Sequence, residues 1–167
     1  MRFENEYSFL SNFYTTPIQV NINGKELLFR NTEAAFQAHK NKSLSDKFCL
    51  LSGYNAKKYG RQIPLDVSLD QWNNNDRYYV MAKVLWIKFQ NETLFKLLQN
   101  VKEPIIEDNY WNDTFWGVCI NKKYDHVGKN VLGQLLTCIK ENGNSEDGLK
   151  ALYKLCEELK EKYRESV

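Results

Sequence analysis

The spacing of apolar residues in the second half of the chain constrains its fold more than any other feature. Between residues 76 and 90, apolar side chains recur every three or four positions, the period of a helix with one buried face. They are Tyr78, Met81, Ala82, Leu85 and Phe89. Similar spacing predicts helices over residues 91–101, 128–139 and 145–165. The last of these is amphipathic, and we expect it to pack on the domain or to serve a partner.

The first half of the chain predicts a small β-element that leads into a short helix. Residues 17–22 and 25–29 are β-prone runs, and the Asn23-Gly24 pair between them is a strong signal for a hairpin turn. Asn31 or Thr32 is then placed to cap a helix that reaches about Lys40.

The remaining segments are short. Residues 43–60 predict a helical hairpin whose two helices end at Gly53 and Gly60, and the polar stretch 66–76 around Trp72 is expected to be irregular. Short strands are predicted at residues 105–107 and 115–120. Because 167 residues are enough for about one domain, the chain predicts a single α+β domain over 1–167, predominantly helical with a small β-element.

Composition argues against several classes of protein. The formal net charge is only +2, which disfavours binding nucleic acid mainly through a basic surface. The four cysteines form no CxxC pair and there are two histidines, so a closed zinc site is not expected. No window is apolar enough to be a signal core or a membrane span. We therefore expect a cytoplasmic protein that uses no membrane, metal or cofactor.

Residues 107–136 carry an unusual mixture of side chains. Within positions 110–116, two tryptophans, a tyrosine and a phenylalanine lie among carboxylates and amides, and a Gly-Lys-Asn turn at 128–130 precedes an apolar helical pattern. Aromatic rings beside polar groups suit a pocket that stacks a flat ring, and a helix N-terminus suits an anion. The alternative is that the aromatic residues belong to the core and the amides form turns.

Two carboxylates stand out as candidates for chemistry. Glu33, Gln37 and Lys40 share one face of the predicted helix, and Asp113 lies among the aromatic residues. Taken alone, such a polar stripe would face solvent. Two carboxyl groups and a wall that stacks a ring are also the equipment of an enzyme that hydrolyses glycosidic bonds. The familiar motifs of nucleophilic hydrolases and phosphate-binding loops do not occur in the sequence.

Seven short motifs occur in order within residues 3–140. They are SNF at 11–13, PI at 17–18, TEAAFQAHK at 32–40, YGR at 59–61, KF at 88–89, NYWNDTFWG at 109–117 and GKNVLGQLL at 128–136. In this order and spacing the chain resembles the NADAR family, the YbiA-like N-glycosidases. The resemblance implies an α+β, mainly helical fold and hydrolysis of an N-glycosidic bond to a ribose.

The resemblance also implies substrates and roles for particular residues. Some members of the family cleave ribosylamino-pyrimidine phosphates of early riboflavin synthesis, and others remove ADP-ribose from guanine in nucleic acid. Glu33 matches the catalytic glutamate, Asp113 the second acidic residue, and Lys40 a lysine able to form a Schiff base with an opened ribose. Positions implied to bind substrate are Asn12, Phe13, Gln37, Trp72, Trp111, Trp116, Gly128, Lys129 and Asn130. The last three would hold a phosphate.

The chain also departs from the family pattern. Ala34-Ala35 follows the glutamate where many members carry a polar residue, the loop 121–127 is longer than usual, and the helix 145–165 lies outside the shared motifs. The choice of substrate therefore stays open, and Lys122, Lys123 and Lys129 are candidates for a local phosphate track on nucleic acid. Alternatives are a module that binds ADP-ribose without cleaving it and a helical interaction protein. The sequence does not predict an oligomeric state.

Overall fold

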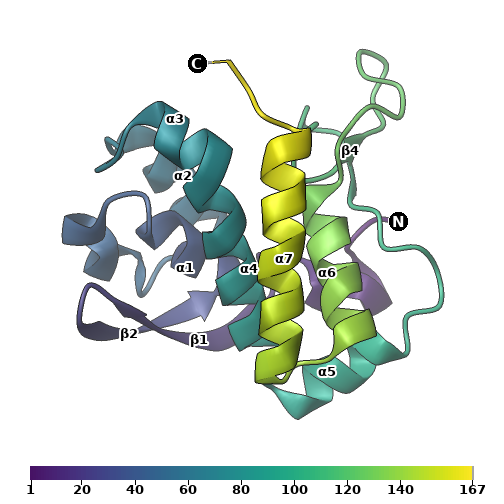
Figure 1. The fold of residues 1–167 in the computed structure, drawn as a ribbon, viewed down its shortest axis with the longest axis horizontal. Helices are drawn as coiled ribbons and strands as arrows, with labels where there is room; N and C mark the ends of the chain where they lie inside the picture. The colour runs from purple at the N-terminus through teal and green to yellow at the C-terminus, as the bar shows by residue number, and fades with distance from the viewer. Residues whose placement is uncertain (167) are drawn as a thin grey trace.

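Helix α4 (Arg77–Lys88) lies at the centre of the computed structural model, which describes residues 1–166. It packs against the N-terminal hairpin and helix α1 on one side and against helices α6 and α7 on the other (Figure 1). The elements in order are η1 (Asn5–Leu10), β1 (Thr15–Ile22), β2 (Lys25–Asn31), α1 (Thr32–Ala38), η2 (Lys42–Phe48), α2 (Gly53–Gln62), α3 (Leu69–Gln71), η3 (Trp72–Asp76), α4, α5 (Glu92–Gln99), β3 (Asp108–Asn109), β4 (Val118–Cys119), α6 (Val131–Asn142) and α7 (Glu146–Lys162). The prediction of a mainly helical α+β fold with a small β-element is confirmed.

The N-terminal hairpin forms as its sequence predicts. Strands β1 and β2 pair antiparallel, and Ile22 lies opposite Lys25 across the turn. Asn23 and Gly24 both have positive φ angles, of 54° and 85°, which suit a type I′ turn and the twist of the strands. Alternate residues of β1 are buried, so one face of the hairpin packs on the core.

Helix α1 begins where the chain leaves strand β2. The side chain of Asn31 accepts a hydrogen bond of 2.8 Å from the backbone N–H of Ala34, so Asn31 is the cap. Every residue of α1 is buried, because the helix packs against the hairpin, η2, α2 and α4. The interpretation that the polar stripe of Glu33 faces solvent is therefore wrong.

Two predictions between α1 and α4 are also wrong. Gly53 begins α2 and does not end a helix, because Ser52 caps it by accepting a hydrogen bond from the N–H of Asn55. A Cβ at Gly53 would lie 2.5 Å from the ring of Phe13, so glycine is required there by close packing. The pattern of neighbouring residues could not predict this contact, because Phe13 and Gly53 are far apart in the sequence.

The stretch expected to be irregular is helical. Ser68 caps α3, and the chain continues through η3, a single turn of π-helix, directly into α4. A π-turn inserts an extra residue, which changes the direction of the side chains that follow and places Trp72 in the core. Asn74 is satisfied by Asp70 at 2.8 Å and by the backbone of Glu165, which offsets the burial of its amide.

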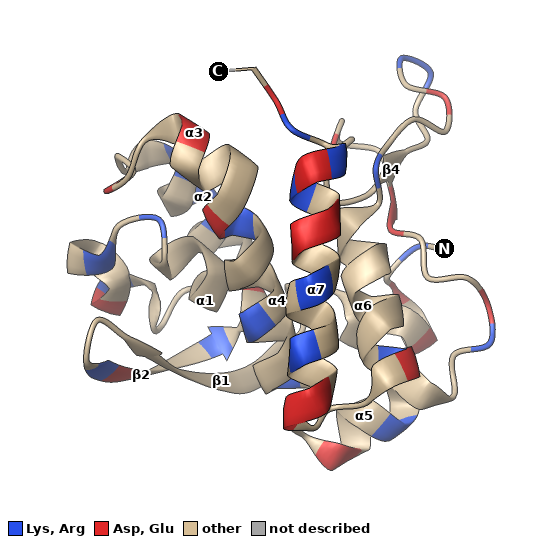
Figure 2. Ribbon diagram, in the orientation of Figure 1, with Lys and Arg blue, Asp and Glu red and all other residues tan. Residues whose placement is uncertain are grey.

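The C-terminal helices complete the core. Asn91 caps α5, the helix predicted over 91–101, and α6 and α7 lie side by side against α4 (Figure 1). Leu152, Cys156 and Leu159 form the buried stripe of α7, while charges of both signs alternate along its outer face (Figure 2). The expectation that this helix packs on the domain is confirmed. The strand predicted at 105–107 is wrong, because the strand β3 begins only after it, where Asp108 and Asn109 pair with β4. The strand predicted at 115–120 reduces to β4, and the two strands form a parallel pair of two residues each.

Within residues 1–166 no helix is long and apolar enough to cross a membrane. All four cysteines are free thiols. The same residues contain no group of three or more histidine, cysteine, aspartate or glutamate side chains arranged to hold a metal ion.

Lys88 is a charged residue placed in the core at the end of α4. It is 1% exposed, and its Nζ donates a hydrogen bond of 2.9 Å to the backbone carbonyl of Ser11. Among residues 1–166 no carboxylate lies within 4.0 Å of it, and its nearest aromatic neighbours are the rings of Tyr14 and Phe89. Burial therefore lowers the pKa of Lys88 to about 7.

This buried amine predicts a pH-dependent stability. Between about pH 7 and the ordinary pKa of lysine, the unfolded chain binds more protons than the folded chain, so stability rises with pH. We expect the free energy of unfolding of the wild type, relative to Lys88→Met, to increase by up to about 1.4 kcal/mol per pH unit over this range. Urea denaturation at pH 7 and pH 9 measures it. The exposed Lys96→Met serves as control, and a difference independent of pH would contradict the prediction.

Candidate active site

Helix α1 holds the side chains of Glu33 and Gln37 together. The amide Nε2 of Gln37 donates a hydrogen bond of 2.8 Å to Oε1 of Glu33, as two residues one helical turn apart can. The backbone N–H of Glu33 donates to the carbonyl of Asn12 at 2.9 Å, which ties the start of α1 to the SNF segment. Glu33 is 7% exposed. The sequence therefore places a carboxylate inside the protein in a fixed orientation.

The surroundings of Glu33 are charged. Burial raises the pKa of its carboxyl, whereas the Gln37 amide and the ammonium groups of Lys57 and Lys40 lower it, and Asp113 raises it again. Within the described residues neither lysine lies within 4.0 Å of the carboxylate, so the attraction acts without a direct ion pair. The fold thus brings Glu33, Lys40 and Asp113 into one neighbourhood, which spacing in the sequence could not show.

Lys40 lies just beyond the C-terminus of α1. Its N–H donates to the carbonyl of Gln37, and its own carbonyl accepts from the N–H of Asp66, so its backbone is fixed from both sides. Burial lowers the pKa of the Lys40 ammonium, Glu33 raises it, and the cations Arg61 and Lys57 lower it. A lowered pKa increases the fraction of neutral amine, the form that acts as a nucleophile.

The loop between β3 and β4 fixes Asp113 by its own hydrogen bonds. Oδ1 of Asp113 accepts from the backbone N–H groups of Phe115, at 3.0 Å, and Trp116, at 2.9 Å. The side chain of Asn109, which is fully buried, bonds to the backbone N–H and C=O of Asp113. One carboxylate oxygen is thus used to shape the loop.

The aromatic residues divide into a packed group and an open ring. Phe36 contacts Trp72 and Trp116, with ring centroids 5.5 Å apart in both pairs, so these rings support the helix of Glu33. Trp72 is only 6% exposed and offers little area for stacking a ligand. Trp111 is 56% exposed, and the Nζ of Lys57 lies 5.8 Å from the centre of its ring. Trp111 is therefore the aromatic face open to a flat ligand.

The turn before α6 does not offer a free anion site. The backbone N–H groups of residues 129–132 donate to the carbonyls of Thr114, Gly117, Phe115 and Trp116 in turn. The side chain of Asn130 bonds to the backbone of Ile105 and Glu107. Nζ of Lys129 lies 3.6 Å from Glu165 and over the ring of Phe115. Carbonyl groups thus occupy the backbone N–H groups of Lys129 and Asn130, which are not free for the phosphate predicted at Gly128, Lys129 and Asn130. For the Lys129 side chain the phosphate site stays a prediction.

The SNF segment, residues 11–13, packs against the start of helix α1. Asn12 is buried, its Nδ2 lies 3.5 Å from the sulfur of Met81, and its Oδ1 is buried without a hydrogen-bond partner among residues 1–166. Phe13 is 42% exposed and packs on Gly53. Asn12 contributes chiefly through its backbone carbonyl, which accepts from Glu33.

Two residues of the neighbourhood were not predicted. Lys57 projects from α2 between Trp111 and the carboxylates, and Glu107 lies just before β3. Glu107 opens the aromatic segment singled out in the sequence, and a carboxylate that follows the apolar pair Ile105-Ile106 is a signal that could have identified it. Lys57 carries no comparable signal, because a lysine on a helix normally faces solvent.

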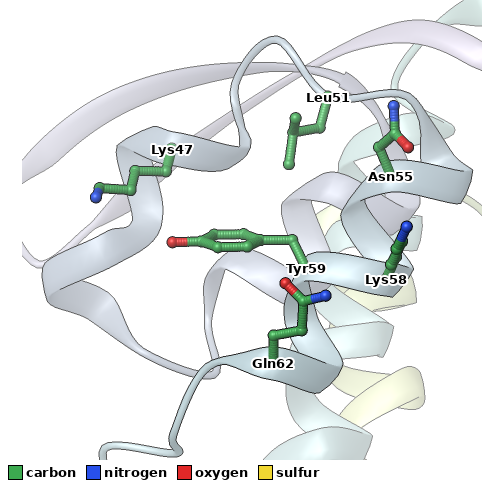
Figure 3. Close-up of a pocket in the computed structure, with 6 residues that line it drawn as sticks. All are labelled: Lys47, Leu51, Asn55, Lys58, Tyr59 and Gln62. Atoms are coloured by element: carbon green, nitrogen blue, oxygen red, sulfur yellow. The ribbon is translucent and has the colours of Figure 1, made fainter.

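Two hollows in the surface lie outside this neighbourhood. One, of about 570 Å³, lies between η2 and α2 and is lined by Lys47, Leu51, Asn55, Lys58, Tyr59 and Gln62 (Figure 3). The other, of about 320 Å³, runs along α6 and includes only Asn130 of the predicted site. Neither hollow is lined by Glu33, Glu107 or Asp113.

The hydrogen bonds of Asp113 predict the stability of its loop. Asp113→Ala removes the acceptor shared by two backbone N–H groups, and we expect it to lower the free energy of unfolding by about 1–2 kcal/mol. Asp113→Asn keeps an oxygen in the same place and should cost much less. Urea denaturation of both variants checks this, and equal losses would show that the charge and not the acceptor matters.

The comparisons with known proteins agree with the fold. The chain matches the NADAR domain over residues 1–142. It is similar to the NMR structure of the E. coli protein YbiA, with 28% sequence identity and a TM-score of 0.65, over 93% of this chain and 86% of that one. No functionally curated protein matches the sequence. Because the NADAR match spans most of the 167 residues, the chain belongs to the NADAR family.

Proposed function

We propose that this protein is an N-glycosidase that hydrolyses the bond between ribose C1 and an exocyclic amino nitrogen of a base. One observation carries the proposal. Glu33 in the buried helix α1 and Lys40 just after it lie close enough to shift each other's pKa, and the loop before β4 brings Asp113 near Glu33. A carboxylate stabilises the positive charge that develops at C1, and an amine of lowered pKa is able to attack that carbon.

The reaction follows from these groups. A ribosylamine can open its sugar ring, and the neutral Lys40 amine then adds to C1. The bond to the base nitrogen breaks with transfer of a proton to that nitrogen, which leaves a protonated imine on Lys40. The Glu33 carboxylate stabilises this cation and accepts a proton from the water that hydrolyses it. The products are the free base, ribose and the regenerated Lys40 amine.

Two substrate classes satisfy this chemistry, a ribosylamino-pyrimidine phosphate and guanine that carries ADP-ribose. The exposed ring of Trp111 supports either, because it can stack a base, and Lys57 beside it supplies a positive charge for a phosphate. Lys122 and Lys123 are exposed in the loop after β4, whose residue Asn121 bonds to the backbone of Tyr110. The loop therefore lies next to the Trp111 segment and favours nucleic acid as one carrier of the adduct.

The proposal includes the cytoplasmic location expected from the sequence. The four cysteines are free thiols, and reduced thiols are the rule in the cytosol.

Replacing the catalytic glutamate tests the reaction directly. We expect Glu33→Gln to lower kcat/KM by at least about 100-fold, because the amide cannot balance the positive charge at C1. Release of free base from guanine-ADP-ribosylated DNA and from a ribosylamino-pyrimidine phosphate is followed, and the ratio of the two kcat/KM values identifies the substrate. Glu26→Gln on the exposed hairpin is the control.

Turnover by Glu33→Gln at the wild-type rate would show that Glu33 is not catalytic. Calorimetry with ADP-ribose accompanies the assay. Binding by the wild type without cleavage of either adduct would replace the enzyme by a module that only binds the nucleotide.

Lys40 has a separate test. If its amine forms an imine with the sugar, sodium borohydride added during turnover should reduce the imine and attach the sugar covalently. We expect mass spectrometry to find the adduct on Lys40 in the wild type and none in Lys40→Arg, whose guanidinium does not form an imine. Full turnover by Lys40→Arg would remove the amine from the mechanism and leave direct attack by water.

A further inference from the structure

Glu107 is held at the meeting point of three elements of the site. Its N–H donates to Oδ1 of Asn130 at 3.0 Å, and its carbonyl accepts from the N–H of Val118 at 2.8 Å. A Cβ on Gly117 would lie 2.7 Å from Oε2 of Glu107. The carboxyl therefore occupies space that only glycine at position 117 leaves open, and hydrogen bonds fix the backbone of Glu107 on both sides.

The carboxyl of Glu107 has an oxygen that the fold leaves unused. Oε2 is fully buried and has no hydrogen-bond partner among the residues that the structure describes. A buried carboxylate without a donor is costly, whereas a protonated carboxyl carries its own donor and needs less from its surroundings. The residue as a whole is half-buried, so the side chain is not sealed inside the core.

The charged groups around Glu107 favour its protonated form. Burial and the Asp113 carboxylate raise the pKa of this carboxyl, Lys57 on α2 lowers it and Glu33 on α1 raises it, which together bring the pKa to about 8. A single cation is thus opposed by two carboxylates. These surroundings favour a carboxyl that holds a proton at neutral pH.

Glu33 has the opposite set of partners. It accepts a hydrogen bond from Gln37 and has two lysines, Lys57 and Lys40, near it. A hydrogen-bond donor and nearby cations favour the ionised form. Burial raises the pKa of both carboxyl groups, but Glu33 has a hydrogen-bond donor and two nearby lysines that oppose this rise, whereas Oε2 of Glu107 has no donor within the described residues. Two carboxyl groups in one site with such different partners suit an acid and a base.

We propose that Glu107 is the acid that protonates the leaving nitrogen, a role that rests on the N-glycosidase function proposed above. When the bond between C1 and nitrogen breaks, its electron pair stays on the nitrogen and the proton of Glu107 joins it. Glu107 becomes a carboxylate. In the second half of the reaction Glu33 takes one proton from the water, and the transfer of this proton to Glu107 restores both groups. The same acid serves whether Lys40 or water attacks C1, because the amine must leave as a neutral base in both cases.

The test compares Glu107→Gln with the wild type on whichever ribosylamine the wild type cleaves. We expect kcat/KM to fall by about 10²–10⁴-fold. The wild-type profile of kcat/KM should decline above about pH 8 as Glu107 loses its proton, and this alkaline decline should disappear in Glu107→Gln. Glu103→Gln, an exposed residue of the same segment, should behave as the wild type.

A second variant separates the acid role from a structural one. Glu107→Asp keeps an acid with a shorter reach, so it should recover part of the lost rate and retain an alkaline decline, and it carries the test even where Glu107→Gln does not fold. Equal rates in Glu107→Asp and Glu107→Gln, or an unchanged profile in Glu107→Gln, would overturn the acid role and leave the N-glycosidase proposal standing. A wild type that cleaves neither ribosylamine would overturn both.

Discussion

The hydrogen bonds between the loop at 114–117 and the first turn of α6 are the interaction on which the site depends. Four consecutive carbonyls of the loop accept the N–H groups that begin the helix, which a helix otherwise leaves without partners inside itself. Gly128 permits the approach, since a Cβ there would lie 2.1 Å from the carbonyl of Gly117. Asn130 adopts a left-handed φ of 50° and uses its side chain to hold Glu107. The position of Asp113, Trp116 and Glu107 therefore follows from one backbone interface.

Helix α1 supplies the other half of the site and is placed by different means. It is short and all its residues are buried, which leaves the polar side chains of Glu33 and Gln37 in the interior. Gln37 uses its donor on Glu33, while its Oε1 is buried with no partner in residues 1–166. A buried carboxylate and an unpaired amide oxygen reduce stability. Proteins retain such costs mainly where function requires them, and this supports the assignment of the chemistry to α1.

Much of the fold could be predicted because it depends on short range patterns. The turn at Asn23-Gly24, the cap at Asn31 and the apolar stripe of α4 are decided by neighbouring residues, and each is found as predicted. The π-turn η3, which begins at Trp72, could not be predicted. The side-chain amide of Asn74 within this turn bonds to the backbone of Glu165, 91 residues away. The same holds for the burial of Glu33 and for the neighbourhood of Glu107. Both depend on segments that only the folded chain brings together.

The turn before α6 limits where the site can bind an anion, because its backbone N–H groups are already bonded to carbonyls. Glycine and lysine before a helix suggested free N–H groups, yet the N–H groups of this turn are the ones that fix the loop of Asp113. A phosphate could enter there only by breaking the interface that holds Asp113. The cations left for a substrate phosphate are Lys57 and Arg61, which lie one helical turn apart on α2 and both lower the pKa of Lys40. In the proposed reaction these cations would attract the phosphate and also favour the neutral amine of Lys40, so that binding and nucleophilic attack would depend on the same charges.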